Sequence, residues 1–157
     1  MIKIDEAFIE KVSQQAKATA RRRMNYNFHH HDSDTLQRML NAMEPDTYIR
    51  PHKHELPDKS EAFFCLRGRI LVVEFDDKGN ISDYIVLDAA QGNFGCEIEP
   101  RSWHSIISLE SGSVAYEVKD GPYDPAVDKH FATWAPPEGH PNALEFNKEI
   151  LRKLQIK

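Results

Sequence analysis

The sequence predicts a mainly β protein, an antiparallel sandwich or barrel with one helix at each end of the chain. Seven short segments between residues 46 and 119 are rich in aromatic and β-branched residues. Turn-forming stretches such as "DDKGN" and "AAQGN" separate them. The segments before and after this region show helical periodicity instead. At 157 residues the chain is long enough to bury one hydrophobic core.

A first helix is expected over Asp5–Arg23, with Asp5 as its N-cap and the basic run Arg21–Arg23 at its C-terminal end. Its apolar residues recur at helical spacing: Phe8, Ile9, Val12, Ala16 and Ala20. The following "NYNFHHHDSD" is rich in turn formers and predicts a loop. The next stretch, "TLQRMLNAME", fits a short helix or a strand, and its composition favours a helix.

Strands and turns then alternate until Lys119. The expected strands are "TYIRPHKH", "EAFFCLRG", "RILVVEFDD", "SDYIVLD", "FGCEIEP", "WHSIISLE" and "SVAYEVK". A proline-rich, irregular tail follows. A last helix is expected over Asn142–Leu154, with an apolar stripe of Leu144, Ile150, Leu151 and Leu154. We therefore expect one domain: helix and loop (1–34), β-barrel (35–119), and extended tail with helix (120–157).

Composition excludes several classes of partner. The net charge of −5 argues against nucleic acid, and the Arg21–Arg23 run is typical of a helix end. No run approaches the ~20 apolar residues of a membrane span. The N-terminal "MIKIDEAFIEKV" lacks the apolar region of a secretory signal. Two cysteines, Cys65 and Cys96, are too few for a disulfide framework and are expected to be core residues in a reducing cytoplasm.

The segment "RPHKHELPDKSEAFFCLRG" predicts a metal site. His52 and His54 are two residues apart on a strand, so their side chains share one face. A turn after them would bring Glu61 alongside, and "RSWHSII" supplies His104 from a later strand. Three imidazoles and a carboxylate suit a divalent Fe, Zn, Ni, Mn or Co ion with an open position. The alternative is that these are strand histidines with ordinary hydrogen-bond partners.

The same alternation places Tyr48 and Arg50 on the histidine face. The planar guanidinium of Arg50 suits a substrate carboxylate or phosphate, or a structural ion pair. Tyr48 is a candidate acid or base near the metal, although an inward aromatic residue also serves as core packing.

The remaining histidines have a weaker claim to the site. His29, His30 and His31 lie in a polar turn and cannot all face one ion, so they are expected at the surface or at the pocket mouth. His130 and His140 lie in the proline-rich tail and are expected to face solvent.

The histidine motifs resemble those of the cupin superfamily, whose fold is a small double-stranded β-barrel (jelly roll) with a metal inside. "HKH" with Glu61 and Gly68 resembles the first cupin motif, and "EPRSWHSIISL" resembles the second, which contributes the last histidine. Six residues separate His54 from Glu61, where the family has three or four. Other departures stand at family glycine, proline and asparagine positions: Asp46, Asn93, Glu99, Arg101 and Ser108.

Nearly the whole chain resembles the WbuC family of cupin-fold metalloproteins, through "NYNFHHHDSDTLQRMLNAMEPDTYIRPHKH", "WHSIISLESGSVAYEVKDGPYDP" and "FATWAPPEG". This resemblance implies a metal-binding protein of bacterial surface-polysaccharide metabolism and, as in many cupins, a homodimer. We expect an enzyme for a small sugar or nucleotide-sugar derivative, of isomerase, epimerase or lyase type. The alternatives are a non-catalytic metal-dependent sugar- or metabolite-binding module and an Fe(II) dioxygenase.

Overall fold

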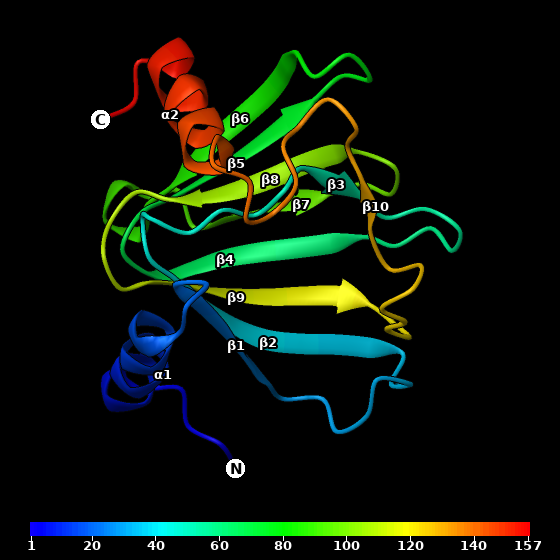
Figure 1. Cartoon of the computed structure of the whole chain (residues 1–157). Helices are drawn as coiled ribbons and strands as arrows, with labels where there is room; N and C mark the ends of the chain where they lie inside the picture. Colours follow the sequence, from blue (N-terminus) through cyan, green and yellow to red (C-terminus); the bar gives the residue numbers. More distant parts are fainter.

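The computed structural model describes residues 1–157 and contains two five-stranded antiparallel sheets that face each other (Figure 1). The strand orders are β1-β2-β9-β4-β7 and β10-β3-β8-β5-β6. The strands are β1 (Arg23–Asn27), β2 (Leu36–Met43), β3 (His52–Lys53), β4 (Glu61–Arg67), β5 (Ile70–Phe75), β6 (Ile81–Leu87), β7 (Gly95–Ile98), β8 (Trp103–Ser108), β9 (Ser113–Asp120) and β10 (His130–Phe131). A short 3-10 turn, η1 (Ala89–Gln91), precedes β7. The expected mainly β fold with a helix at each end is confirmed.

The first helix, α1 (Glu6–Ala18), covers the outer face of the first sheet (Figure 1). The Asp5 side chain accepts a hydrogen bond from the Phe8 amide at 3.0 Å, which confirms it as the N-cap. The buried contact joins residues of α1, β2 and β9: Ile9, Val12, Ala16, Leu40, Ala42 and Val114. The helix ends at Ala18 rather than Arg23, because Arg22 has a left-handed backbone (φ 57°) and Arg23 already begins β1.

One expectation near the N-terminus is wrong, because residues 25–27, expected in a loop, belong to β1. The stretch 35–44, which fits a helix or a strand by sequence, contains β2, although its composition favours a helix. The reason lies in the burial of β2, whose residues from Met39 to Met43 are all buried. Its outer face lies under α1 and its inner face lines the interior, so the strand does not alternate between apolar and polar residues.

The C-terminal helix, α2 (Ala143–Leu154), packs on the outer face of the second sheet. Ile150 is buried there against Leu71 and Ile107, while Leu151 and Leu154 are partly buried. Leu144 is 40% exposed, so its expected place in the apolar stripe is wrong. None of the helices is long and apolar enough to cross a membrane.

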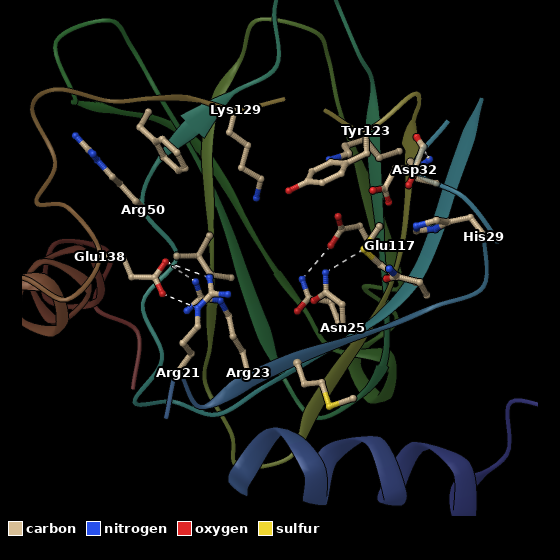
Figure 2. Close-up of a pocket in the computed structure, with 18 residues that line it drawn as sticks. Arg21, Arg23, Asn25, His29, Asp32, Arg50, Glu117, Tyr123, Lys129 and Glu138 are labelled. Carbon is tan, nitrogen blue, oxygen red and sulfur yellow. Dashed lines mark hydrogen bonds and ion pairs between the residues drawn. The ribbon is translucent and has the colours of Figure 1, made fainter. Parts of the chain in front are cut away.

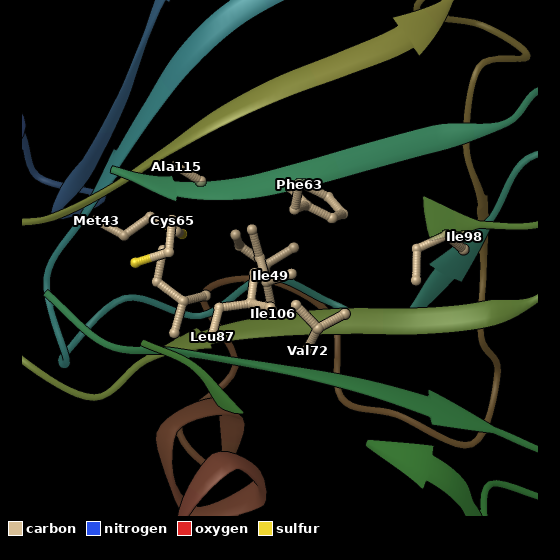
Figure 3. Close-up of a cluster of buried hydrophobic side chains, with 10 residues drawn as sticks. Met43, Ile49, Phe63, Cys65, Val72, Leu87, Ile98, Ile106 and Ala115 are labelled. Atoms are coloured by element: carbon tan, nitrogen blue, oxygen red, sulfur yellow. The ribbon is translucent and has the colours of Figure 1, made fainter. Parts of the chain in front are cut away.

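An apolar core of ten residues lies between the two sheets (Figure 3). It contains the two apolar inward residues of β4, Phe63 and Cys65, together with Ile106 of β8. Gly68 turns the chain from β4 to β5 with φ 77°, and a Cβ there would lie 2.4 Å from the Ser113 hydroxyl oxygen.

Candidate metal centre

Four buried side chains converge between the sheets: His52, His54, Glu61 and His104. Their potential ligand atoms all lie within 4.8 Å of one another, and no residue of the four is more than 3% exposed. His52 in β3 is paired directly with His104 in β8, and His54 follows β3. Glu61 begins β4 in the opposite sheet and closes the group from the other side. The four residues expected from the sequence to meet do so.

Each of the three imidazoles is oriented through its Nδ1 atom, which lies within hydrogen-bond distance of a backbone carbonyl. The carbonyls belong to Arg50 for His52 (3.0 Å), Asp128 for His54, and Ser102 for His104 (3.0 Å). A carbonyl oxygen only accepts, so each Nδ1 carries the hydrogen and donates it. This leaves Nε2 of each ring as the atom directed into the cluster, the arrangement that metal-binding histidines show.

The Nε2 atoms meet the Glu61 carboxylate. Nε2 of His104 lies 2.9 Å from Oε2 of Glu61, and Nε2 of His54 lies 3.4 Å from the same oxygen. Nε2 of His52 and Nε2 of His54 are buried without a hydrogen-bond partner. Buried lone pairs that face one another need a proton or a cation between them. The donor set therefore fits a divalent metal, since imidazole nitrogen and carboxylate oxygen are ligands for Zn, Fe, Ni and Mn.

The electrostatics of the cluster hold these groups ready to bind a cation. Burial lowers the pKa of His52 well below its ordinary value, and the positive charge of Lys129 lowers it further. Burial opposes ionisation of Glu61, but the interaction of its carboxylate with the imidazoles of His104 and His54 outweighs this effect, so the pKa of Glu61 lies well below its ordinary value. At neutral pH the His52 ring is uncharged and Glu61 is a carboxylate.

A polar cavity of about 490 Å³ lies beside the cluster (Figure 2). Its lining comes from the inner faces of β1, β2 and β9, from the segment before β3, and from the tail: Arg21, Arg23, Met24, Asn25, Asn27, His29, Asp32, Gln37, Met39, Asn41, Ile49, Arg50, Glu117, Lys119, Tyr123, Lys129, Phe131 and Glu138. None of the four cluster residues is among them. Two lining residues link the cavity to the cluster. The Glu117 carboxyl hydrogen-bonds Glu61, and the Phe131 ring centroid is 6.2 Å from that of His52.

Glu117 is the carboxyl group shared by cavity and cluster. Burial, the charge of Glu61 and the hydrogen bond with Glu61 raise the pKa of Glu117 to about 8. Its other contact is Nδ2 of Asn41, which donates to Oε2 of Glu117 at 2.9 Å. A carboxyl group that holds its proton near neutral pH is suited to general acid or base work.

Of the two residues expected to act beside the metal, Arg50 lines the cavity and Tyr48 does not. The Arg50 guanidinium lines the cavity but donates twice to the Ala132 carbonyl, and Figure 2 shows it turned away from Glu117. The Tyr48 hydroxyl donates to the Pro136 carbonyl at 2.8 Å, and its ring packs against Phe146 of α2. Only residues 52–53 of the expected strand are paired, so the alternation that put Tyr48 on the histidine face does not extend to it.

The other histidines lie outside the cluster. His29 lines the cavity, and its Nδ1 accepts a hydrogen bond from the Arg38 amide at 3.1 Å. His30 and His31 lie in the turn that follows, and both are exposed as expected. His130 lies in β10 beside Glu55 with a side chain 35% exposed, so it is only partly solvent-facing. His140 is exposed as expected.

Three residues of the site did not emerge from the sequence: Asn41, Glu117 and Lys129. The available signal was the alternation of β9, where Ala115, Glu117 and Lys119 share one face. If apolar residues are assumed to face the interior, this alternation wrongly predicts that Glu117 and Lys119 face solvent. Here the apolar face of the sheet lies under α1 and the polar face lines the cavity.

The facing sheets and the buried three-histidine, one-glutamate cluster define a cupin-like barrel with a potential metal site. The chain belongs to the family described as "Domain of unknown function (DUF6016)", whose model matches residues 4–87, more than half of the chain. The matching family model is thus DUF6016 and not WbuC. No curated protein matches the sequence.

Several solved structures share the fold. An L-ribose isomerase from Cellulomonas parahominis matches with a TM-score of 0.56 at 14% identity, over 79% of this chain and 71% of that one. A 3,4-ketoisomerase from Helicobacter canadensis matches with a TM-score of 0.50 at 17% identity, over 60% and 68%. The capsular polysaccharide assembling protein CapF from Staphylococcus aureus matches with a TM-score of 0.52 at 18% identity, over 63% of this chain. The match spans only 27% of CapF.

Proposed function

We propose that this protein is a metal-dependent enzyme that acts on a small sugar derivative, as an isomerase, epimerase or lyase. One observation carries the proposal. Three Nε2 atoms and one carboxylate converge in a buried cluster, and that cluster shares Glu117 with a polar cavity of about 490 Å³. Cavities of this size are typical of small-molecule sites.

His52, His54, Glu61 and His104 would hold the metal. When bound there, a divalent ion supplies Lewis-acid chemistry, polarising a substrate oxygen or lowering the pKa of a bound water. The carbonyl partners of the three Nδ1 atoms keep the histidine rings oriented. Two of these carbonyls, of Arg50 and Ser102, lie only two residues before their histidines, so the local backbone itself sets the orientation of the ring.

Within the cavity, isomerisation, epimerisation and elimination all require a group that moves a proton between the substrate and the protein. Glu117 is our candidate, since its carboxyl lies on the cavity wall and contacts the cluster. Arg50 remains a proposed substrate-binding residue on the cavity rim, through the part of its guanidinium that does not hold Ala132. The acid or base role expected for Tyr48 stays a prediction, and the engagement of its hydroxyl by Pro136 disfavours it.

Similar proteins support the substrate class and the setting. Two of the structural neighbours are isomerases by name, an L-ribose isomerase and a 3,4-ketoisomerase, and the first of them acts on a sugar. A third is a capsular polysaccharide assembling protein. These descriptions agree with the polysaccharide setting that the WbuC resemblance implies, and we propose that setting for this chain. The single-domain organisation, cytoplasmic location and homodimer stay predictions, and light scattering after size exclusion tests the dimer.

A second candidate function is a metal-dependent sugar- or metabolite-binding module. The observation that favours it is the lining of the cavity, which includes none of the four cluster residues. In that case the metal would hold the two sheets together without contacting the ligand. An Fe(II) dioxygenase is a variant of the enzyme reading, and the identity of the bound metal decides between them.

The test is the metal content of untagged protein by mass spectrometry, measured for the parent and for His52→Ala and His104→Ala. His140→Ala is the matched control, because His140 is exposed and outside the cluster. We expect near-stoichiometric metal in the parent and in His140→Ala, and its loss in the other two variants. The loaded protein is then tested for turnover of aldoses, ketoses and their acidic derivatives.

Each result bears on a different part of the proposal. A parent that binds no metal even after reconstitution would overturn the metal site. If the parent and Glu117→Gln both bind metal and sugar but neither turns the sugar over, the binding module is favoured. Metal binding with turnover that Glu117→Gln abolishes would establish the enzyme. Iron in the site would direct the search to oxygen chemistry, and zinc, nickel or manganese to Lewis-acid chemistry.

A further inference from the structure

We propose that the cavity binds a sugar that carries an acidic group, with Lys129 holding the carboxylate or phosphate and Asn41 accepting from a sugar hydroxyl. The inference rests on the proposed function and names the substrate class of the same site. The evidence is that two polar groups on the cavity wall, the ammonium group of Lys129 and Oδ1 of Asn41, have no hydrogen-bond partner within the protein.

Lys129 is the one cation of the cavity wall with no hydrogen-bond or ion-pair partner in the protein. Arg21 and Arg23 both pair with Glu138, at 2.6 and 2.8 Å. Lys119 donates to Asp128 at 2.6 Å. The fifth cation, Arg50, donates to a backbone carbonyl. Lys129 extends from the tail into the cavity with its ammonium group unpaired (Figure 2), so this part of the wall favours an anion.

The position of Lys129 is fixed by its neighbour. Asp128 is buried and ion-paired with Lys59 and Lys119, at 2.6 Å to each. The backbone carbonyl of Asp128 also accepts the hydrogen bond from His54. These contacts anchor the backbone from which the Lys129 side chain extends into the cavity.

Lys129 also lies close to the cluster. Its charge is the second cause, after burial, of the lowered pKa of His52, and the charge of Glu61 acts in turn on Lys129. An acidic group held by Lys129 would therefore bring the adjacent carbons of the sugar close to the cluster and to Glu117. This is the part of the cavity where chemistry at the metal centre can reach them.

The wall below Lys129 carries carboxamides. Asn25 and Asn27 of β1, Gln37 and Asn41 of β2 all line the cavity. Asn41 is only 7% exposed, and its Oδ1 atom has no hydrogen-bond partner. An acceptor in that position needs a donor, and a sugar hydroxyl provides one. Amide groups that both donate and accept are suited to a row of hydroxyls.

An isothermal titration of the purified protein, with its metal content measured, tests the proposal. The probes are D-glucuronate and D-galacturonate, D-glucose 6-phosphate, and the neutral D-glucose and D-galactose. The variants are Lys129→Met, which keeps the length but not the charge, and Asn41→Leu, which keeps the shape but not the amide. Lys148→Met is the control, since Lys148 is an exposed lysine on α2.

We expect acidic sugars to bind the parent at least about tenfold more tightly than neutral ones, as charge-assisted hydrogen bonds allow. Lys129→Met should remove that preference, Asn41→Leu should weaken binding of every sugar, and Lys148→Met should change neither. Whether the uronates or glucose 6-phosphate bind more tightly shows whether the acidic group of the substrate is a carboxylate or a phosphate. If Asn41→Leu does not fold, Asn27→Leu at a more exposed position serves the same purpose.

Three results would overturn the inference: equal affinity of the parent for acidic and neutral sugars, no binding of any probe, or an unchanged preference in Lys129→Met. The failure of the metal site is separate, because metal content is measured directly. Metal without a preference for acidic sugars leaves the proposed function standing and removes only the acidic substrate. A preference for acidic sugars in a protein that binds no metal would support the acidic substrate and remove the proposed metal-dependent function.

Discussion

The backbone carbonyl of Asp128, in the C-terminal tail, accepts a hydrogen bond from Nδ1 of His54 in the cluster. The Asp128 side chain meanwhile pairs with Lys59 and Lys119. Residue 128 thus ties the tail to the barrel and orients one potential metal ligand at the same time. The tail is a wall of the site, since Tyr123, Lys129 and Phe131 line the cavity.

Asp128→Asn is expected to destabilise the protein strongly. It removes the carboxylate that pairs with the two buried ammonium groups of Lys59 and Lys119, which costs about 3–5 kcal/mol in the free energy of unfolding. Denaturation by urea measures this change. Asp124→Asn is the control, because Asp124 is exposed and accepts only the Ala126 amide through its side chain. A loss below about 1 kcal/mol in Asp128→Asn would show that the ion pairs do not hold the tail.

Metal binding is expected to stabilise the fold, because the cluster joins both sheets. A free metal concentration one hundred times Kd adds about 2.7 kcal/mol to the free energy of unfolding. Thermal unfolding with the metal found in the protein, and again after a chelator, measures the effect. The melting temperature should fall on chelation in the parent and stay unchanged in His104→Ala. An equal response of both proteins would mean that the metal binds elsewhere.

Leu40→Ala is expected to destabilise the contact between α1 and the first sheet. Leu40 is fully buried beneath the helix, so its truncation should cost about 3 kcal/mol. Leu36 lies on the same face of β2 but is 46% exposed, and Leu36→Ala should change stability by no more than about 0.5 kcal/mol. Chemical denaturation of the pair tests this, and similar losses in both would contradict the described packing.

Alkaline pH is expected to destabilise the protein through Tyr48. Burial raises the pKa of Tyr48 from 10.0 to about 12 in the folded state. Between these values the unfolded chain loses the phenol proton and the folded chain keeps it, so unfolding becomes easier as pH rises. The loss reaches about 3 kcal/mol above pH 12. Ultraviolet titration of tyrosinate, compared with Tyr48→Phe, locates the pKa, and a value near 10 would contradict the burial described here.

The fold class and the convergence of four residues could be predicted from local patterns. Side chains two residues apart on an extended chain point the same way, and this holds from His52 in β3 to His54 directly after it. Glu61 begins β4 and His104 is the second residue of β8, and the antiparallel pattern brings both strands near the histidine pair. The position of Tyr48 could not be predicted this way, because Tyr48 lies four residues before β3 and alternation does not extend that far from a paired strand.

The cavity could not be predicted from the sequence for a different reason. An alternating strand shows which face is apolar, but the apolar face need not be the inner one. In β2 and β9 the apolar face lies under α1, a helix distant in sequence, while Asn41 and Glu117 face inward. Strand alternation was therefore enough to find the histidine cluster. The wall that would hold a substrate depends on where the helix and the tail pack, and local sequence does not encode that.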